Sequence, residues 1–111
     1  MLERINSGNF SAAVLQSELP VLLDFYSTWC VPCRLLLAEL ERISETSAEK
    51  VRVGRVNVEY EPELTAKYRI YEIPTVIVFR NGRPTGRPFH RLSPCGGNRK
   101  HDIENMKGVK I

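Results

Sequence analysis

Apolar runs and alternating apolar residues along the chain predict the strands of a central sheet. Val21–Tyr26 is apolar except for one acidic position, which is typical of a strand buried on both faces. Residues 75–80 form a second apolar run. Between these runs, the valines of Val51–Val58 change phase at Gly54 and Arg55. This pattern indicates a strand that is covered on both faces or one that contains a bulge.

Three further segments predict helices that alternate with these strands. The longest follows the first apolar run, and its apolar residues at i, i+4 and i+7 form a core-facing stripe: Leu36, Leu40 and Ile43. A first helix, capped by Asn6 or Ser7, is expected to run to about Ser17, after a short edge strand at Leu2–Ile5. A short helix is expected over Pro62–Tyr68. The order β-α-β-α-β-α-β predicts an α/β fold.

The C-terminal quarter departs from this regular pattern. Asn81 and Gly82 predict a type I′ hairpin turn, and Arg83–Arg91 should form the second arm of the hairpin. That arm contains residues that weaken a strand or confine it to an edge: Pro84, Gly86 and Pro88. We therefore expect an irregular edge strand, then a loop, and a weakly docked helix from about Asn98 to Lys107.

The bulk composition predicts one globular domain over residues 1–111, with 42% hydrophobic residues. No apolar stretch is long enough to span a membrane, and residues 1–6 hold no apolar signal core. We therefore expect a monomer in the cytoplasm that makes no membrane contact. The net positive charge is concentrated after residue 82, where the sum is +5 against +3 for the whole chain. Without aromatic interleaving or a binding motif, this charge is typical of a solvated surface, and no nucleic-acid partner is expected.

Residues 29–33 read Trp-Cys-Val-Pro-Cys and carry the candidate chemistry. They open the long helix, whose free N–H groups and dipole favour a thiolate. The spacing of Cys30 and Cys33 lets their sulfurs bond across the first turn of the helix. Because Cys30 precedes Pro32, its sulfur should lie at the exposed end of the helix and act as the nucleophile. Cys33, one turn further in, would then resolve the mixed disulfide with the substrate.

Other interpretations of the cysteines stay open at this point. The pair could bind a metal ion or be idle, but a structural zinc site needs four ligands. The further donors His90, Cys95 and His101 lie at unsuitable spacing, so we expect redox chemistry and no metal. The third cysteine, Cys95, could be a regulatory or a dimerising thiol, and we expect it to have no role.

The motif and its surroundings resemble the thioredoxin family from about Phe10 to Gly82. The matching residues, in chain order, are Asp24, Trp29, Cys30, Pro32, Cys33, Arg34, Ile73, Pro74, Thr75, Asn81 and Gly82. The resemblance implies a thioredoxin-like fold with a central mixed sheet of four to five strands flanked by helices. Residues 83–111 are expected to diverge from the family pattern, with an atypical C-terminal strand and helix.

The resemblance also implies roles for a buried acid and its partner. A carboxylate in an apolar strand is costly unless it is paired or protonated, so Asp24 is expected to serve a purpose. By resemblance, it transfers protons to and from Cys33, and Arg55 matches a basic position near it in the family. A purely structural Asp24–Arg55 pair is the alternative interpretation.

The remaining candidate residues would bind the substrate. By resemblance, the Ile73–Pro74 peptide is cis, lies opposite Cys30, offers backbone groups to an extended substrate and keeps the dithiol from capturing a metal ion. Three residues of the motif are expected at the same site: Trp29, Val31 and Pro32. Val31 replaces the glycine that is usual in the family. His90 stands at another family glycine, where it would stabilise the Cys30 thiolate, contact substrate, or be only a surface residue.

Together these features predict a small protein-disulfide reductase that acts on disulfide-containing proteins. No bound cofactor is expected, because the redox-active Cys30–Cys33 disulfide carries the electrons. An upstream disulfide reductase is implied by the resemblance. An oxidase or isomerase variant would use the same machinery at a different redox poise. The rivals from other classes are a binding or scaffold module with incidental cysteines, and a metal-binding module.

Overall fold

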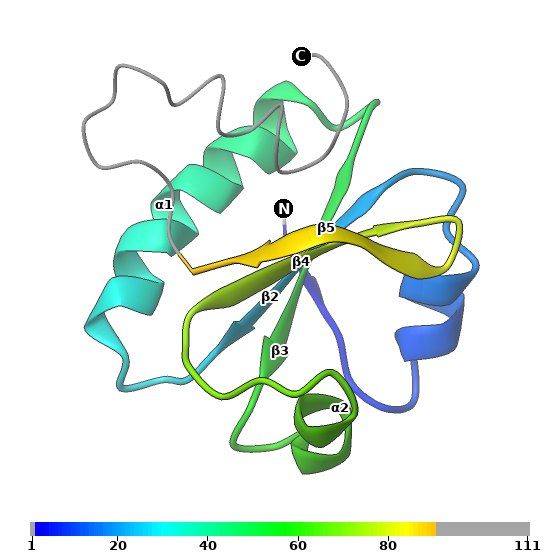
Figure 1. Cartoon of the computed structure of the whole chain (residues 1–111). Coiled ribbons are helices and arrows are strands. Elements are labelled where there is room, and N and C mark those ends of the chain that lie inside the picture. The colour runs from blue at the N-terminus through cyan, green and yellow to red at the C-terminus, as the bar shows by residue number, and fades with distance from the viewer. Residues whose placement is uncertain (1, 91–111) are drawn as a thin grey trace.

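A computed structural model describes residues 2–90 and shows one five-stranded sheet. The strands lie in the order β1-β3-β2-β4-β5 (Figure 1). Their bounds are Glu3–Arg4 for β1, Val21–Tyr26 for β2, Arg52–Asn57 for β3, Thr75–Arg80 for β4 and Arg83–Phe89 for β5. β1, β3 and β2 are parallel, β4 is antiparallel to β2, and β5 is antiparallel to β4. The expected mixed sheet is therefore confirmed.

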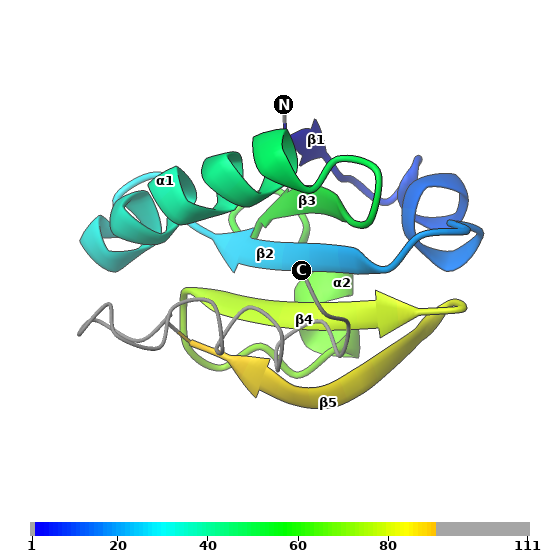
Figure 2. The ribbon, with the colours of Figure 1, turned by 90° about the horizontal axis from the view of Figure 1, so that it is seen from above.

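Helical segments cover both faces of this sheet. They are η1 at Ser11–Leu15, α1 at Val31–Thr46 and α2 at Pro62–Lys67. Figure 1 shows α1 and α2 on opposite faces, and Figure 2 shows the five strands side by side with β1 and β5 at the edges. Within residues 2–90, no helix is long and apolar enough to cross a membrane.

Two apolar clusters, one on each face of the sheet, form the core. The cluster under α1 consists of Leu22, Leu36, Leu40, Ile43, Val51, Val53, Val76 and Val78. This confirms the predicted stripe on the long helix. On the other face, Val21, Leu23 and Phe25 of β2 pack in the second cluster with residues of η1 and α2. Because side chains alternate along a strand, Asp24 and Tyr26 share the α1 face with Leu22.

Burial on both faces explains the phase change of the valines in β3. Val53 packs in the cluster under α1, whereas Val56 packs in the cluster on the opposite face. The pairing of β3 with β2 runs without a shift from Arg52 to Asn57. Of the two possibilities that the sequence left open, the structure shows the strand covered on both faces and not the bulge.

The first helix is shorter than its predicted span to about Ser17. The Asn6 side chain accepts the backbone N–H groups of Gly8 and Asn9, so this turn precedes the helical segment. η1 itself is a single widened turn of five residues, and its last hydrogen bond runs from Gln16 N–H to Ser11 O. The Ser17 hydroxyl then bonds both backbone groups of Leu19, which ends the helical path.

The hairpin of β4 and β5 forms as predicted. Asn81 and Gly82 both have positive φ, at 53° and 80°, as a type I′ turn requires. β5 is an edge strand, and its pairing with β4 shifts register between Val76 and Val78. This confirms the irregular edge strand. The predicted helix at 98–107 lies outside the described residues, as does Cys95.

Replacing Gly82 by alanine is expected to destabilise the fold by about 2–5 kcal/mol. A positive φ costs an L-residue about 1–2 kcal/mol, and overpacking adds about 1–3 kcal/mol. A Cβ at Gly82 would lie 2.8 Å from the backbone oxygen of Leu15. Gly86, with φ 68° and nothing within 4 Å of a built Cβ, is the matched control. Urea unfolding should give a smaller loss for Gly86→Ala, and equal losses would show that the Leu15 contact gives way.

Candidate active site

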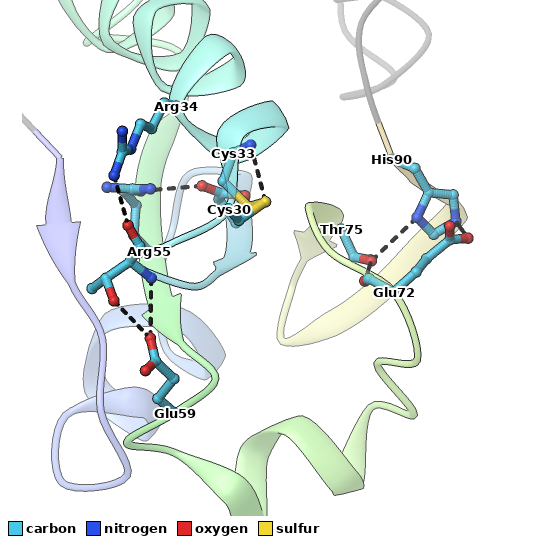
Figure 3. Close-up of a disulfide and its surroundings, with 10 residues drawn as sticks. Cys30, Cys33, Arg34, Arg55, Glu59, Glu72, Thr75 and His90 are labelled. Carbon is cyan, nitrogen blue, oxygen red and sulfur yellow. Dashed lines mark hydrogen bonds and ion pairs between the residues drawn. A yellow bond between two sulfur atoms is a disulfide. The ribbon is translucent and has the colours of Figure 1, made fainter.

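The cysteine pair lies where the chain leaves β2 and enters α1. Cys30 is the N-cap residue, with an extended backbone, and Cys33 lies in the first turn. The two are joined by a disulfide, with Cα atoms 5.3 Å apart. The Cys33 backbone N–H donates to Cys30 Sγ at 3.2 Å (Figure 3). Since this N–H is one of the free donors of a helix N-terminus, it can stabilise a thiolate on Cys30 after reduction.

The two cysteines differ in depth. Cys30 is 6% exposed and Cys33 is 1% exposed. Pro32 lies in the first turn of α1, where the absence of an N–H leaves no helical hydrogen bond unmade. The geometry therefore offers one sulfur at the helix end and keeps the other behind it.

Apolar side chains are exposed around the cysteine pair. Trp29 and Val31 are 69% and 62% exposed, and Leu35 is 72% exposed. Val31 and Leu35 are spaced i, i+4 and therefore share the outward face of α1. Leu35 was not among the residues predicted for the site, although its position out of phase with the buried stripe is a signal in the sequence. Such exposed apolar side chains beside a reactive group are typical of a contact surface.

The segment before β4 reaches the same end of the sheet as the cysteines. The Ile73–Pro74 peptide is cis, Pro74 is buried and Ile73 is partly buried. Thr75 pairs with Phe25 near the end of β2, from which the chain continues to Cys30. The structure therefore places this peptide and the cysteine motif on neighbouring segments.

Asp24 is fully buried on the α1 face and is paired with Arg55. Arg55 Nε donates to Asp24 Oδ2 at 3.1 Å, and the side chains are 17% and 0% exposed respectively. Burial raises the pKa of Asp24 from 3.8 to about 6, and the charge and hydrogen bond of Arg55 offset part of that rise. Cys33 precedes Leu36 by three residues on the buried face of α1, and Leu36 packs in the same cluster as Leu22. Asp24 and Cys33 are therefore both buried in the layer between β2 and α1.

A hydrogen-bonded anchor that the sequence did not predict fixes the turn before Cys30. Glu59 Oε1 accepts both the backbone N–H of Thr28 at 3.0 Å and its hydroxyl at 2.9 Å. Arg34 Nη2 donates to the carbonyl oxygen of Thr28 at 3.2 Å (Figure 3). All the hydrogen-bonding groups of Thr28 are thus held by Arg34 of α1 and by Glu59 of the turn after β3. No local signal marks Glu59, because it lies 31 residues from Thr28.

Removing this anchor is expected to lower the catalytic rate of the protein without unfolding it. Glu59→Ala should lower kcat/KM for disulfide reduction about 5- to 20-fold, because a displaced catalytic group loses productive orientation. Glu59→Gln keeps an acceptor oxygen and should stay within about twofold of the wild type. The check is steady-state kinetics on both variants beside thermal unfolding. If Glu59→Ala had the same kcat/KM as Glu59→Gln and the wild type, the anchor would not orient Cys30.

His90 faces the segment before β4. Its Nδ1 lies 3.2 Å from Thr75 Oγ1, and its Nε2 lies 3.2 Å from Glu72 Oε1 (Figure 3). Both ring nitrogens are thereby engaged by groups other than the cysteines. Its side chain is 47% exposed. The possibilities that the sequence raised for His90, which are stabilising the Cys30 thiolate, contacting substrate or being only a surface residue, stay predictions. Among the residues that the structure describes, no three His, Cys, Asp or Glu side chains group as metal ligands.

Comparisons with known proteins agree with this geometry. The model of the thioredoxin family matches residues 1–105. Thioredoxins from Rickettsia bellii and Alicyclobacillus acidocaldarius are each 44% identical, over 82 and 80 residues. These matches cover 74% and 72% of this chain, and 78% and 75% of the relatives. The chloroplastic thioredoxin Y1 of Arabidopsis thaliana is 38% identical over 79 residues, which cover 71% of this chain and 46% of that protein.

A disulfide across the first turn of a helix at the end of a central strand defines a thiol–disulfide oxidoreductase. The chain belongs to the thioredoxin family. Its fold and its activity on disulfide substrates, expected from the sequence, are confirmed.

Proposed function

We propose that this oxidoreductase works as a reductase of protein disulfides, with Cys30 as the nucleophile. The Cys30 thiolate attacks one sulfur of the substrate disulfide, and the other sulfur leaves as a thiolate. Cys33 then attacks Cys30, which forms the Cys30–Cys33 disulfide and releases the second substrate sulfur. Two electrons pass to the substrate, whose two sulfurs leave as thiolates and then take up protons. The observation that carries this assignment is the Cys33 N–H bonded to Cys30 Sγ at the helix N-terminus.

Asp24 is the proposed proton acceptor for Cys33 in the resolving step. The Cys33 thiol must lose its proton before it attacks, and water reaches neither buried side chain directly. With a pKa of about 6, Asp24 is mostly ionised at pH 7 and close enough to neutrality to take up and return a proton. Arg55, hydrogen-bonded to Asp24, is the proposed charge partner that keeps the carboxylate form accessible.

The proposed substrate site lies between the motif and the cis peptide. An extended substrate segment would pair with the backbone at Ile73, before Pro74, with its cysteine facing Cys30. Trp29, Val31 and Pro32 would contact the same segment from the other side. The exposure of Trp29 and Val31 supports this assignment, because both side chains have apolar surface to bury on binding.

The electron source, compartment and oligomeric state are part of the same proposal. A relative from Mycobacterium leprae is named as a bifunctional thioredoxin reductase/thioredoxin, and it is 36% identical over 83 residues, which cover 75% of this chain and 18% of that protein. That name supports an upstream disulfide reductase as the donor for this chain. The two sulfurs store the electrons, so the protein would need no bound cofactor. We place the monomeric protein in the cytoplasm, where a reducing environment suits a disulfide reductase.

The test is the rate at which the full chain, with a small dithiol as electron source, reduces the disulfides of a test protein. We expect turnover far above that of the dithiol alone. A rate equal to the dithiol background would overturn the reductase assignment. Faster oxidation of a reduced, unfolded test protein than reduction of the oxidised one would instead identify the oxidase variant.

A further inference from the structure

The Asp24–Arg55 pair has a third member on the same face of the sheet. Tyr26 follows Asp24 by two residues on β2, so both side chains point toward α1. The guanidinium carbon of Arg55 lies 3.6 Å from the centroid of the Tyr26 ring. Arg55 is therefore held from two sides, by the Asp24 carboxylate at 3.1 Å and by the face of an aromatic ring.

A cavity beside Tyr26 and Arg55 offers the Arg55 guanidinium a second location. Tyr26 and Arg55 both line a cavity of about 550 Å³ between α1 and β1. Besides Arg55, its charged lining residues are Glu3 and Arg4 of β1, and Glu41 and Glu45 of α1. Glu3 is already bonded to Arg52 at 2.6 Å. Glu41 and Glu45 are exposed carboxylates on one face of α1, and they would attract a free guanidinium into the cavity.

We propose that Tyr26 is a positioning residue, whose ring holds the Arg55 guanidinium on Asp24 and out of the acidic cavity. The ring lies against the guanidinium while Nε is bonded to Asp24, so without the ring Arg55 gains room to turn toward Glu41 and Glu45. Asp24 would then stay buried but would no longer be paired with the Arg55 guanidinium. This role rests on the proposed function of Asp24 as proton acceptor, because only there does the position of Arg55 affect turnover.

The consequence is a change in the pH dependence of the resolving step. Burial favours the neutral form of Asp24, and Arg55 is the cation that opposes it. Arg4 adds positive charge at the cavity, whereas Glu3, Glu41 and Glu45 add negative charge. When Arg55 moves to the carboxylates of α1, Asp24 stays protonated to higher pH. The acceptor is then available only in more alkaline solution.

The experiment compares Tyr26→Leu with Tyr26→Phe, which keeps the aromatic face. Carbon-13 NMR titration of the Asp24 carboxyl group gives its ionisation in the full oxidised chain. We expect Tyr26→Phe to titrate as the wild type does, and Tyr26→Leu to titrate at least about 0.5 pH units higher. In the reductase assay, the alkaline shift should lower turnover of Tyr26→Leu about twofold at pH 6, with convergence near pH 9. Tyr26→Met, an unbranched side chain without a ring, serves if the leucine variant does not fold.

Two further variants separate this inference from the function on which it rests. Adding Glu41→Gln and Glu45→Gln to Tyr26→Leu should move the titration back toward that of the wild type, because the competing anions are gone. An unchanged Asp24 titration in both Tyr26→Leu and Tyr26→Met would overturn the positioning role. A shifted titration with an unshifted turnover profile would support the positioning role and refute Asp24 as the proton acceptor.

Discussion

Cys30→Ser is expected to abolish disulfide reduction, with a turnover rate at least about 1,000-fold lower. Cys33→Ser is instead expected to leave the protein joined to its substrate by a mixed disulfide. A serine hydroxyl does not ionise near neutral pH, so the donor N–H of Cys33 has no thiolate to stabilise. In Cys33→Ser, by contrast, Cys30 still attacks. No second thiol is present in the motif to release the mixed disulfide.

The two variants are each other's control. Incubation with a disulfide-bonded test protein, followed by a non-reducing gel, should show a covalent adduct for Cys33→Ser and none for Cys30→Ser. Addition of a dithiol should remove the adduct. An adduct formed by Cys30→Ser alone would assign the nucleophile to Cys33, in conflict with the deeper burial of that residue.

Asp24→Asn is expected to raise the free energy of unfolding and to lower the turnover rate. A pKa raised from 3.8 to about 6 corresponds to about 3 kcal/mol of destabilisation once the carboxyl group is ionised in the folded state. Asparagine fills nearly the same space without the charge. It leaves the partly buried Arg55 without an anion, so we expect a net gain of about 1–3 kcal/mol at pH 8. Turnover at pH 7 should fall about tenfold or more, since the proton acceptor is lost.

The gain in stability of Asp24→Asn is expected to depend on pH. Between about pH 4 and pH 6, folded Asp24 keeps a proton that the unfolded chain has lost. The wild type therefore loses stability as the pH rises through this window. Above it, the destabilisation caused by the ionised Asp24 is constant. Asparagine does not titrate, so the advantage of the variant should be absent near pH 4 and full above pH 7. Urea unfolding at both values checks this, and an equal gain at both would show that the carboxylate is not the cause.

Patterns within single elements allowed much of the fold to be predicted. The i, i+4, i+7 stripe at Leu36, Leu40 and Ile43 fixed the buried face of α1, because helical periodicity depends only on near neighbours. The Asn81-Gly82 pair similarly predicted its turn, since few residues accept two positive φ values.

Contacts between distant segments could not be predicted in this way. Glu59 binds Thr28 across 31 residues, and the stacking of Arg55 on Tyr26 depends on the register of β3 against β2. The short span of η1 has a local cause, because side-chain bonds of Asn6 and Ser17 compete with the helix backbone at its two ends. The two long-range contacts, by contrast, need the tertiary arrangement before they can be recognised.

The irregular edge strand also bears on how the protein behaves at high concentration. An open sheet edge is a template for another chain, because its unpaired N–H and C=O groups accept an incoming strand. Pro84 and Pro88 in β5 have no N–H to donate, and Gly86, with positive φ, breaks the extended path between them. At the opposite edge, β1 is only two residues long. In the part of the chain that the structure describes, neither edge offers an unbroken row of donors and acceptors, so growth of the sheet from molecule to molecule, the first step toward fibrils, is disfavoured at both ends.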